Sequence, residues 1–152
     1  MKRKIFFYII AFFLISSCGY QPIYSNNENS NFKIKEIFLK GDDQINKKII
    51  SQTKLIQNTS DKNGIKIHLE SYKKNEISSK DNSGNPLTFL MTINTIIKIE
   101  DQGNERQKSY NESFSYSNKD NKFDLNEYQK TIEQNLIISL SEKILMFLNL
   151  KK

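Results

Sequence analysis

The chain is poor in the residues that build disulfides, metal sites and catalytic centres. Its 152 residues include 1 Cys, 1 His and no Trp. A single thiol excludes an intramolecular disulfide, so the folded part must be stabilised by its core. The one histidine, His68, has no second His or Cys at ligand spacing, and we predict no metal site. His68 falls on the polar phase of a segment in which apolar and polar residues alternate, so we predict that it is a surface residue.

Sequence motifs of common enzymes are also missing. The chain has no GxSxG elbow, no SxxK, no phosphate-binding loop and no GxGxxG. Residues 61–70 weakly resemble a calcium loop, but the glycine comes at the fourth position and not the sixth. We therefore predict a protein that works by binding, without a cofactor.

The charge gives little reason to expect nucleic-acid binding. The sequence has 23 basic and 17 acidic residues. Three of the basic residues lie at positions 2–4, so 20 remain against 17 beyond them, a net charge of +3. All of these remaining basic residues except Arg106 are lysines. Such a weak excess does not predict a nucleic-acid partner.

Residues 15–18, ISSC, have the pattern of a lipobox. They follow a basic stretch at 2–4 and an apolar run of 11 residues at 5–15. At about 1.5 Å per residue this run is too short to span a hydrocarbon core of about 30 Å. We predict a signal peptide at 1–17, cleavage between Ser17 and Cys18, and covalent diacylglycerol and N-acyl lipid on Cys18. The alternatives are an ordinary secretory signal with a chance cysteine, or a slightly longer membrane helix.

Residues 18–31 are predicted to be a lipidated tether that leads into one domain at 32–152. Tyr20, Pro22 and Tyr24 in its first part indicate either an ordered contact with a membrane partner or aromatics resting among lipid headgroups. Gly19, and not Asp, follows Cys18. This favours anchoring in the outer membrane.

The first half of the domain alternates between strand and helix patterns. Residues 32–40 predict a strand whose phase shifts near Glu36. Asp42 or Asp43 is expected to cap a helix that fades by residue 58 and turns Ile45, Ile49 and Ile56 toward a core. Residues 65–77 then predict a half-buried strand, followed by a polar loop at 78–85.

The second half carries the strongest patterns. Apolar residues alternate over 86–100, which predicts the central strand, and a hairpin turn at 101–104 leads to a strand at 109–117. A long helix follows, with Asp124 expected as its cap and Glu127 as the reciprocal partner of a capping box.

These elements predict an α+β fold. We expect a four-stranded mixed, mostly antiparallel sheet with two helices on one face, in the order strand, helix, three strands, helix. The other face of the sheet would be polar and open. The lysines of the second strand and the loop after it, Lys73, Lys74 and Lys80, indicate either contacts to anionic groups such as lipopolysaccharide phosphates or simply a solvated surface.

The start of the predicted mature chain resembles that of a known family. Residues 18–24, CGYQPIY, are similar to the Cys-Gly-aromatic-x-Pro-aliphatic-Tyr start of LptE proteins of the alphaproteobacterial type, which are lipopolysaccharide-assembly lipoproteins. The order of elements and the threonine-rich third strand are also similar. The chain departs from the family in being short and nearly devoid of arginine.

The resemblance implies a lipoprotein that plugs the outer-membrane barrel LptD, helps this barrel to assemble, and assists delivery of lipopolysaccharide to the cell surface. The domain would lie on the periplasmic side or within the barrel lumen. Two other classes remain open. One is an accessory lipoprotein of another envelope complex, such as a pilotin or a transporter auxiliary subunit, and the other is an envelope hydrolase.

Overall fold

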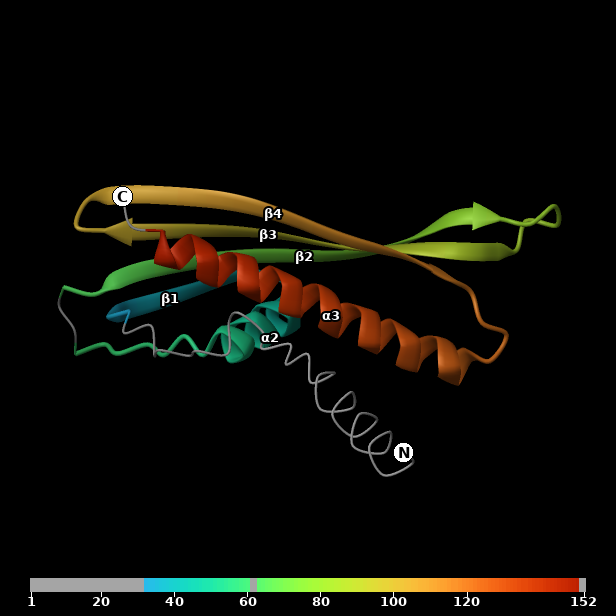
Figure 1. Cartoon of the computed structure of the whole chain (residues 1–152), viewed down its shortest axis with the longest axis horizontal. Helices are drawn as coiled ribbons and strands as arrows, with labels where there is room; N and C mark the ends of the chain where they lie inside the picture. Colours follow the sequence, from blue (N-terminus) through green and yellow to red (C-terminus); the bar gives the residue numbers. More distant parts are fainter. Residues whose placement is uncertain (1–31, 61–62, 151–152) are drawn as a thin grey trace, which may run out of the picture. The chain divides into compact units, whose positions relative to one another are not determined.

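Four strands and two helices follow one another in the order that the sequence predicts. The computed structural model describes residues 32–60 and 63–150. The elements, shown in Figure 1, are β1 (Ile34–Gly41), α2 (Asp43–Thr53), β2 (Ile65–Lys80), β3 (Pro86–Asp101), β4 (Asn104–Ser117) and α3 (Lys122–Asn149).

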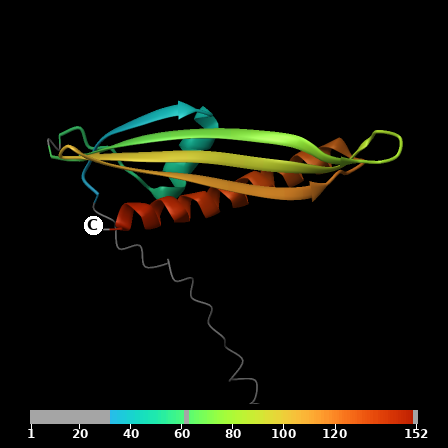
Figure 2. The same cartoon turned by 90° about the horizontal axis from the view of Figure 1, so that it is seen from above.

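The strands form one mixed sheet in the order β1-β2-β3-β4 (Figure 2). Strand β1 is parallel to β2, whereas β2, β3 and β4 are mutually antiparallel. The pairing of β1 shifts register between Ile34 and Glu36, which confirms the predicted irregularity near Glu36. The predicted α+β class, with its four-stranded mixed sheet and two helices, is thereby confirmed.

Both helices pack on the same face of the sheet (Figure 1). Because side chains alternate along a strand, one phase of β2 and β3 points to the helices and supplies the sheet's half of the core. The largest fully buried apolar side chains come from both layers: Ile34, Ile67, Leu69, Ile93, Ile97 and Ile99 from the sheet, and Ile45, Ile49, Leu140 and Ile144 from the helices.

The helices do not cover this face evenly. Strand β2 has 16 residues, about 53 Å of extended chain, whereas α2 has 11 residues, about 16 Å of helix. Strand β1 accompanies β2 only as far as Ser71. Residues 72–80, 86–94 and 111–117, here called the distal half of the sheet, therefore lie beyond both β1 and its helix. Leu87 and Phe114, which lie on the helix-facing phase of β3 and β4, are 50% and 46% exposed there.

The structure corrects three predicted boundaries. Helix α2 ends at Thr53, because Lys54 turns into the left-handed region at φ 53°, and Ile56 is exposed and not part of the core. Residue Asn121, not Asp124, caps α3, and its side chain accepts the N–H of Phe123. The loop predicted at 78–85 is shorter than expected because β2 continues to Lys80, opposite Pro86.

A tight turn joins β3 to β4. Its two central residues, Gln102 and Gly103, have φ angles of 47° and 87°. Two successive positive φ angles are typical of the type I′ turn, whose twist matches that of the paired strands. The turn fixes Asp101 opposite Asn104 and thereby sets the register of the whole β3–β4 pair.

Candidate interaction surfaces

The face of the sheet turned away from the helices is polar, as predicted, and we call it the outer face. In its distal half, cross-strand neighbours form rows of mostly polar side chains, interrupted by Leu90. These rows are Tyr72–Asn94–Asn111, Lys74–Thr92–Ser113 and Glu76–Leu90–Ser115. A face of this kind retains water and can exchange hydrogen bonds with a polar partner.

Charges on the other half of the outer face are arranged as neighbouring ion pairs. The Lys98 ammonium lies 3.1 Å from a Glu100 oxygen and 2.9 Å from a Glu105 oxygen. Hydrogen bonds to Glu105 and Glu100 raise the pKa of Lys98, and the hydrogen bond from Lys98 is the main cause that lowers the pKa of Glu100. Lys40 likewise pairs with Glu70 at 2.9 Å. The charges cancel locally, so this face offers no field of one sign.

His68 belongs to this neutral network. Its Nε2 atom lies 3.0 Å from a Glu100 oxygen, and its ring stacks on Phe38 with centroids 4.6 Å apart. The side chain is 38% exposed. Within residues 32–60 and 63–150, no group of three or more His, Cys, Asp or Glu side chains could hold a metal ion.

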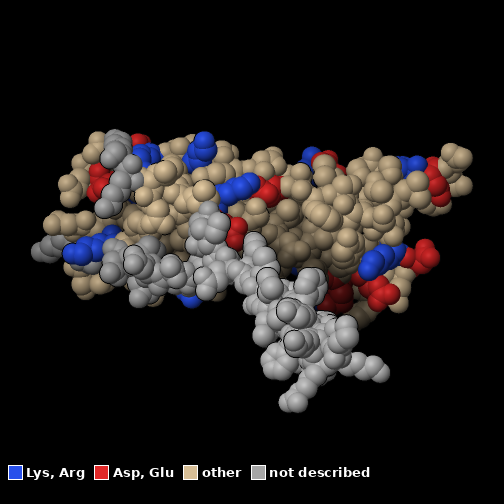
Figure 3. Space-filling view, viewed as in Figure 1, with Lys and Arg blue, Asp and Glu red and all other residues tan. Residues whose placement is uncertain are grey.

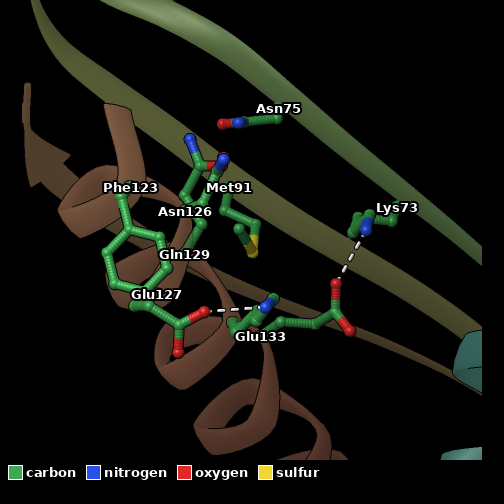
Figure 4. A pocket seen from close by; sticks show the side chains of 9 residues that line it. Lys73, Asn75, Met91, Phe123, Asn126, Glu127, Gln129 and Glu133 are labelled. Atoms are coloured by element: carbon green, nitrogen blue, oxygen red, sulfur yellow. Dashed lines mark hydrogen bonds and ion pairs between the residues drawn. The ribbon is translucent and has the colours of Figure 1, made fainter. Parts of the chain in front are cut away.

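A groove of about 310 Å³ opens between the distal half of the sheet and the first half of α3 (Figure 4). Lys73 and Asn75 of β2 line one wall, Met91 of β3 lies between the walls, and α3 supplies the other wall from Phe123 to Glu133. The groove exists because α2 is too short to fill this side of the layer.

Aromatic side chains hold the sheet and α3 together beside the groove. The Tyr116 ring lies edge-on to Tyr128 with centroids 5.9 Å apart and is stacked on Phe89 at 5.5 Å. Its hydroxyl donates to Asn75 Oδ1 and accepts a hydrogen bond from Gln129, both at 2.9 Å. The walls of the groove are therefore tied to each other through one buried tyrosine.

A carboxylate at the edge of the groove joins three elements. The side chain of Glu133 in α3 is 12% exposed. Its carboxylate oxygens form ion pairs with Lys48 Nζ of α2 at 2.5 Å and with Lys73 Nζ of β2 at 2.7 Å. Burial by itself would raise the pKa of Glu133, but the hydrogen bonds and the positive charges of the two lysines together outweigh it, and the net pKa is lowered. Sequence reasoning missed this cluster, because Glu133 lies 85 residues from Lys48 and 60 residues from Lys73 in the sequence.

The three lysines predicted to contact anionic groups do not form one patch. The β2 register places Lys73 on the helix side, where it pairs with Glu133, and Lys74 on the outer face, where it pairs with Glu76 at 2.7 Å. Lys80 is exposed at the end of β2. Figure 3 shows the same mixture over the visible face, where basic and acidic residues are interspersed.

The predicted lipidation and cleavage residues, Cys18 and Ser17, lie outside the described residues. Among the residues that are described, no helix is long and apolar enough to cross a membrane.

Comparison with known proteins identifies the fold. No family profile and no curated protein matches the sequence. Several solved structures are nevertheless similar. A rare lipoprotein B from Shewanella oneidensis superposes with a TM-score of 0.59 at 9% identity, over 74% of this chain and 92% of that chain.

Two further structures agree. Lipoprotein B from Nitrosomonas europaea has a TM-score of 0.56 at 11% identity, over 76% of this chain and 84% of that chain. A minor lipoprotein from Acinetobacter baumannii has a TM-score of 0.53 at 17% identity, over 72% and 88% of the two chains. The chain has a fold found in bacterial lipoproteins.

Proposed function

We propose that the protein is an outer-membrane lipoprotein that binds and plugs the LptD barrel, assisting assembly of the barrel and delivery of lipopolysaccharide to the cell surface. Acyl chains on Cys18 would hold it at the membrane, since each buried CH₂ contributes about 0.8 kcal/mol and two or three chains make release negligible. The lipobox at 15–18 and the fold shared with bacterial lipoproteins support the anchor.

The observation that carries the proposal is the polar outer face, which neither α2 nor α3 covers, in a fold shared with lipoproteins. The lumen of a large outer-membrane barrel is polar and wet. A partner for such a lumen needs hydroxyl and amide groups that make direct or water-mediated hydrogen bonds, and balanced charges that cost little to bring near a polar wall. Rows such as Tyr72–Asn94–Asn111 supply the first requirement, and the Lys98–Glu100–Glu105 network supplies the second.

Direct contact with lipopolysaccharide is a further part of the proposal. Lys80 is exposed at the end of β2, and Lys74 is 67% exposed and pairs with a half-exposed carboxylate, Glu76. Both are better placed to reach phosphates than Lys73, which is 36% exposed and pairs with the largely buried Glu133. Such binding would be electrostatic and noncatalytic. It predicts that Lys74→Ala with Lys80→Ala weakens binding of the purified lipoprotein to lipopolysaccharide, whereas Lys73→Ala acts mainly on stability.

Site-specific photocrosslinking in the native envelope tests the proposed surface. A crosslinking amino acid at Asn94, exposed on the outer face in the inner strand β3, is expected to give one adduct with a large outer-membrane barrel. The same probe at Gln134, exposed on α3, is the matched control and should give this adduct less efficiently. An adduct of Asn94 with a secretin or with transporter subunits would favour the accessory-lipoprotein alternative. A single polar substitution that abolishes function while complex formation persists would favour the hydrolase.

A further inference from the structure

Among residues 32–60 and 63–150, no strand pairs with the outer edge of β4, and the free backbone groups of this edge can be assigned residue by residue. In a two-residue type I′ hairpin, the residues flanking the turn exchange hydrogen bonds, here Asp101 with Asn104. At the other end, Asn118 donates its N–H to the Leu87 carbonyl at 2.8 Å, in the same register. The even-numbered residues of β4 thus bond to β3. The odd-numbered ones, 105 to 117, direct their N–H and C=O groups outward.

This edge lacks the usual backbone devices against pairing with another strand. Its register with β3 continues without a shift from Asn104 to Ser117, and the strand contains no proline. By contrast, the distal edge of β2 is interrupted by irregularities between Ile77 and Lys80. Small polar side chains accompany the free groups of β4, namely Ser109, Asn111, Ser113, Ser115 and Ser117. An unbroken edge of this length is a template for a further strand.

Inward-pointing charges are another protection that an edge strand can have. Arg106 lies over the Phe147 ring and donates to the Leu150 carbonyl at 2.6 Å. Glu112 is bound by Lys143 and by Ser139. Within the described part of the chain, Lys108 alone among these charged side chains has no partner. A strand that placed a carboxylate opposite Lys108 would remove this protection.

We propose that a second copy of this chain supplies that strand, with two β4 strands pairing antiparallel about a two-fold axis at Tyr110. The axis places Lys108 of each copy opposite Glu112 of the other, and the symmetry forms this contact twice. It also places Ser109 opposite Asn111, so that odd-numbered residues with free backbone groups face each other. The result is a continuous eight-stranded sheet.

A carboxylate between two lysines, as proposed for Glu112 in the dimer, already occurs elsewhere in this chain. Glu133 is held between two lysines, Lys48 and Lys73. In the dimer, Glu112 would likewise lie between its own Lys143 and the second copy's Lys108. Shifting the axis to Asn111 would instead bring Lys108 opposite Phe114. Charge complementarity thus favours the axis at Tyr110.

Sedimentation equilibrium of the intact mature lipoprotein in density-matched detergent tests the proposal. The wild type should show a concentration-dependent dimer. Lys108→Glu, which sets two carboxylates against each other twice, should weaken association at least roughly tenfold, and Lys108→Ala should weaken it less. Ser109→Pro should abolish the dimer, because its N–H faces outward and is not needed by β3. Ser109→Thr keeps that N–H and should still dimerise.

Cysteine pairing then checks the register, with melting temperatures as a control for folding. A mixture of Ser109→Cys and Asn111→Cys chains should form disulfides between unlike chains, whereas Ser109→Cys alone should not, because its two copies would be diagonal neighbours. A monomer at all concentrations, a dimer insensitive to Ser109→Pro, or disulfides that ignore the register would overturn the proposal. None of these results depends on a barrel partner.

Discussion

Replacing Glu133 by glutamine should destabilise the domain by about 1–2 kcal/mol. The substitution keeps the size of the side chain but removes the charge that Lys48 and Lys73 share, at 2.5 Å and 2.7 Å. Hydrogen bonds to charged groups contribute about 1.5–3 kcal/mol when the site is shielded. The two lysines remain 54% and 36% exposed, so water would rehydrate them in part after the carboxylate is removed, which reduces the expected loss.

Thermal and denaturant unfolding of the variant measures this loss. For a domain of this size, about 1–2 kcal/mol corresponds to a fall in melting temperature of roughly 3–8 °C. Glu127→Gln is the matched control, because Glu127 is on the same helix and pairs with Lys130 at 2.7 Å, but the two side chains are 51% and 75% exposed. We expect that control to change stability by less than about 0.5 kcal/mol. Equal effects of the two substitutions would refute the argument from burial.

The difference in folding stability between the wild type and Glu133→Gln should depend on pH. The pKa of Glu133 is lowered in the folded state from its ordinary value of 4.5. A carboxyl with a depressed folded pKa adds stability that is complete above its unfolded pKa and disappears as the pH falls through the folded value. The stability difference between wild type and Glu133→Gln should therefore be constant near neutrality and shrink below about pH 4.5. A difference that grows on acidification would contradict this assignment.

Five further substitutions, two of them controls, test local features. Gly41→Ala should cost several kcal/mol or prevent folding, because the new Cβ would lie 2.2 Å from a backbone oxygen of β2, whereas Gly84→Ala meets no atom within 4 Å and should cost about 1–2 kcal/mol from its positive φ alone. Asn121→Ala should lower the melting temperature by removing a cap of about 1 kcal/mol, and Asp124→Ala should have a smaller effect. Cys18→Ala should move the protein from the membrane fraction to the soluble fraction.

The sequence was sufficient to predict the order of elements, because periodicity is a local property. The alternation of Met91, Ile93, Ile97 and Ile99 could only suit a strand with one buried face, and these side chains are buried. The boundaries were less predictable, since several residues could serve as each cap. Asn121 and Asp124 are both good caps, and only the path of the chain after β4 decides between them.

The candidate surfaces could not all be predicted from local sequence patterns, because they depend on how separate elements are placed in space. The groove follows from the difference in length between α2 and β2, and the cluster around Glu133 joins residues from three elements. The polar outer face was predictable from alternation. The separation of Lys73 from Lys74 onto opposite faces follows from that same alternation once the strand is known to continue through both.

Affinity purification of the tagged lipoprotein from detergent-extracted envelopes of its own cells, followed by mass identification, tests the central claim most directly. The proposed function predicts that a large outer-membrane barrel, LptD, stays bound near one-to-one after stringent washing. Recovery of a secretin, of inner-membrane transporter subunits, or of the lipoprotein alone would contradict it.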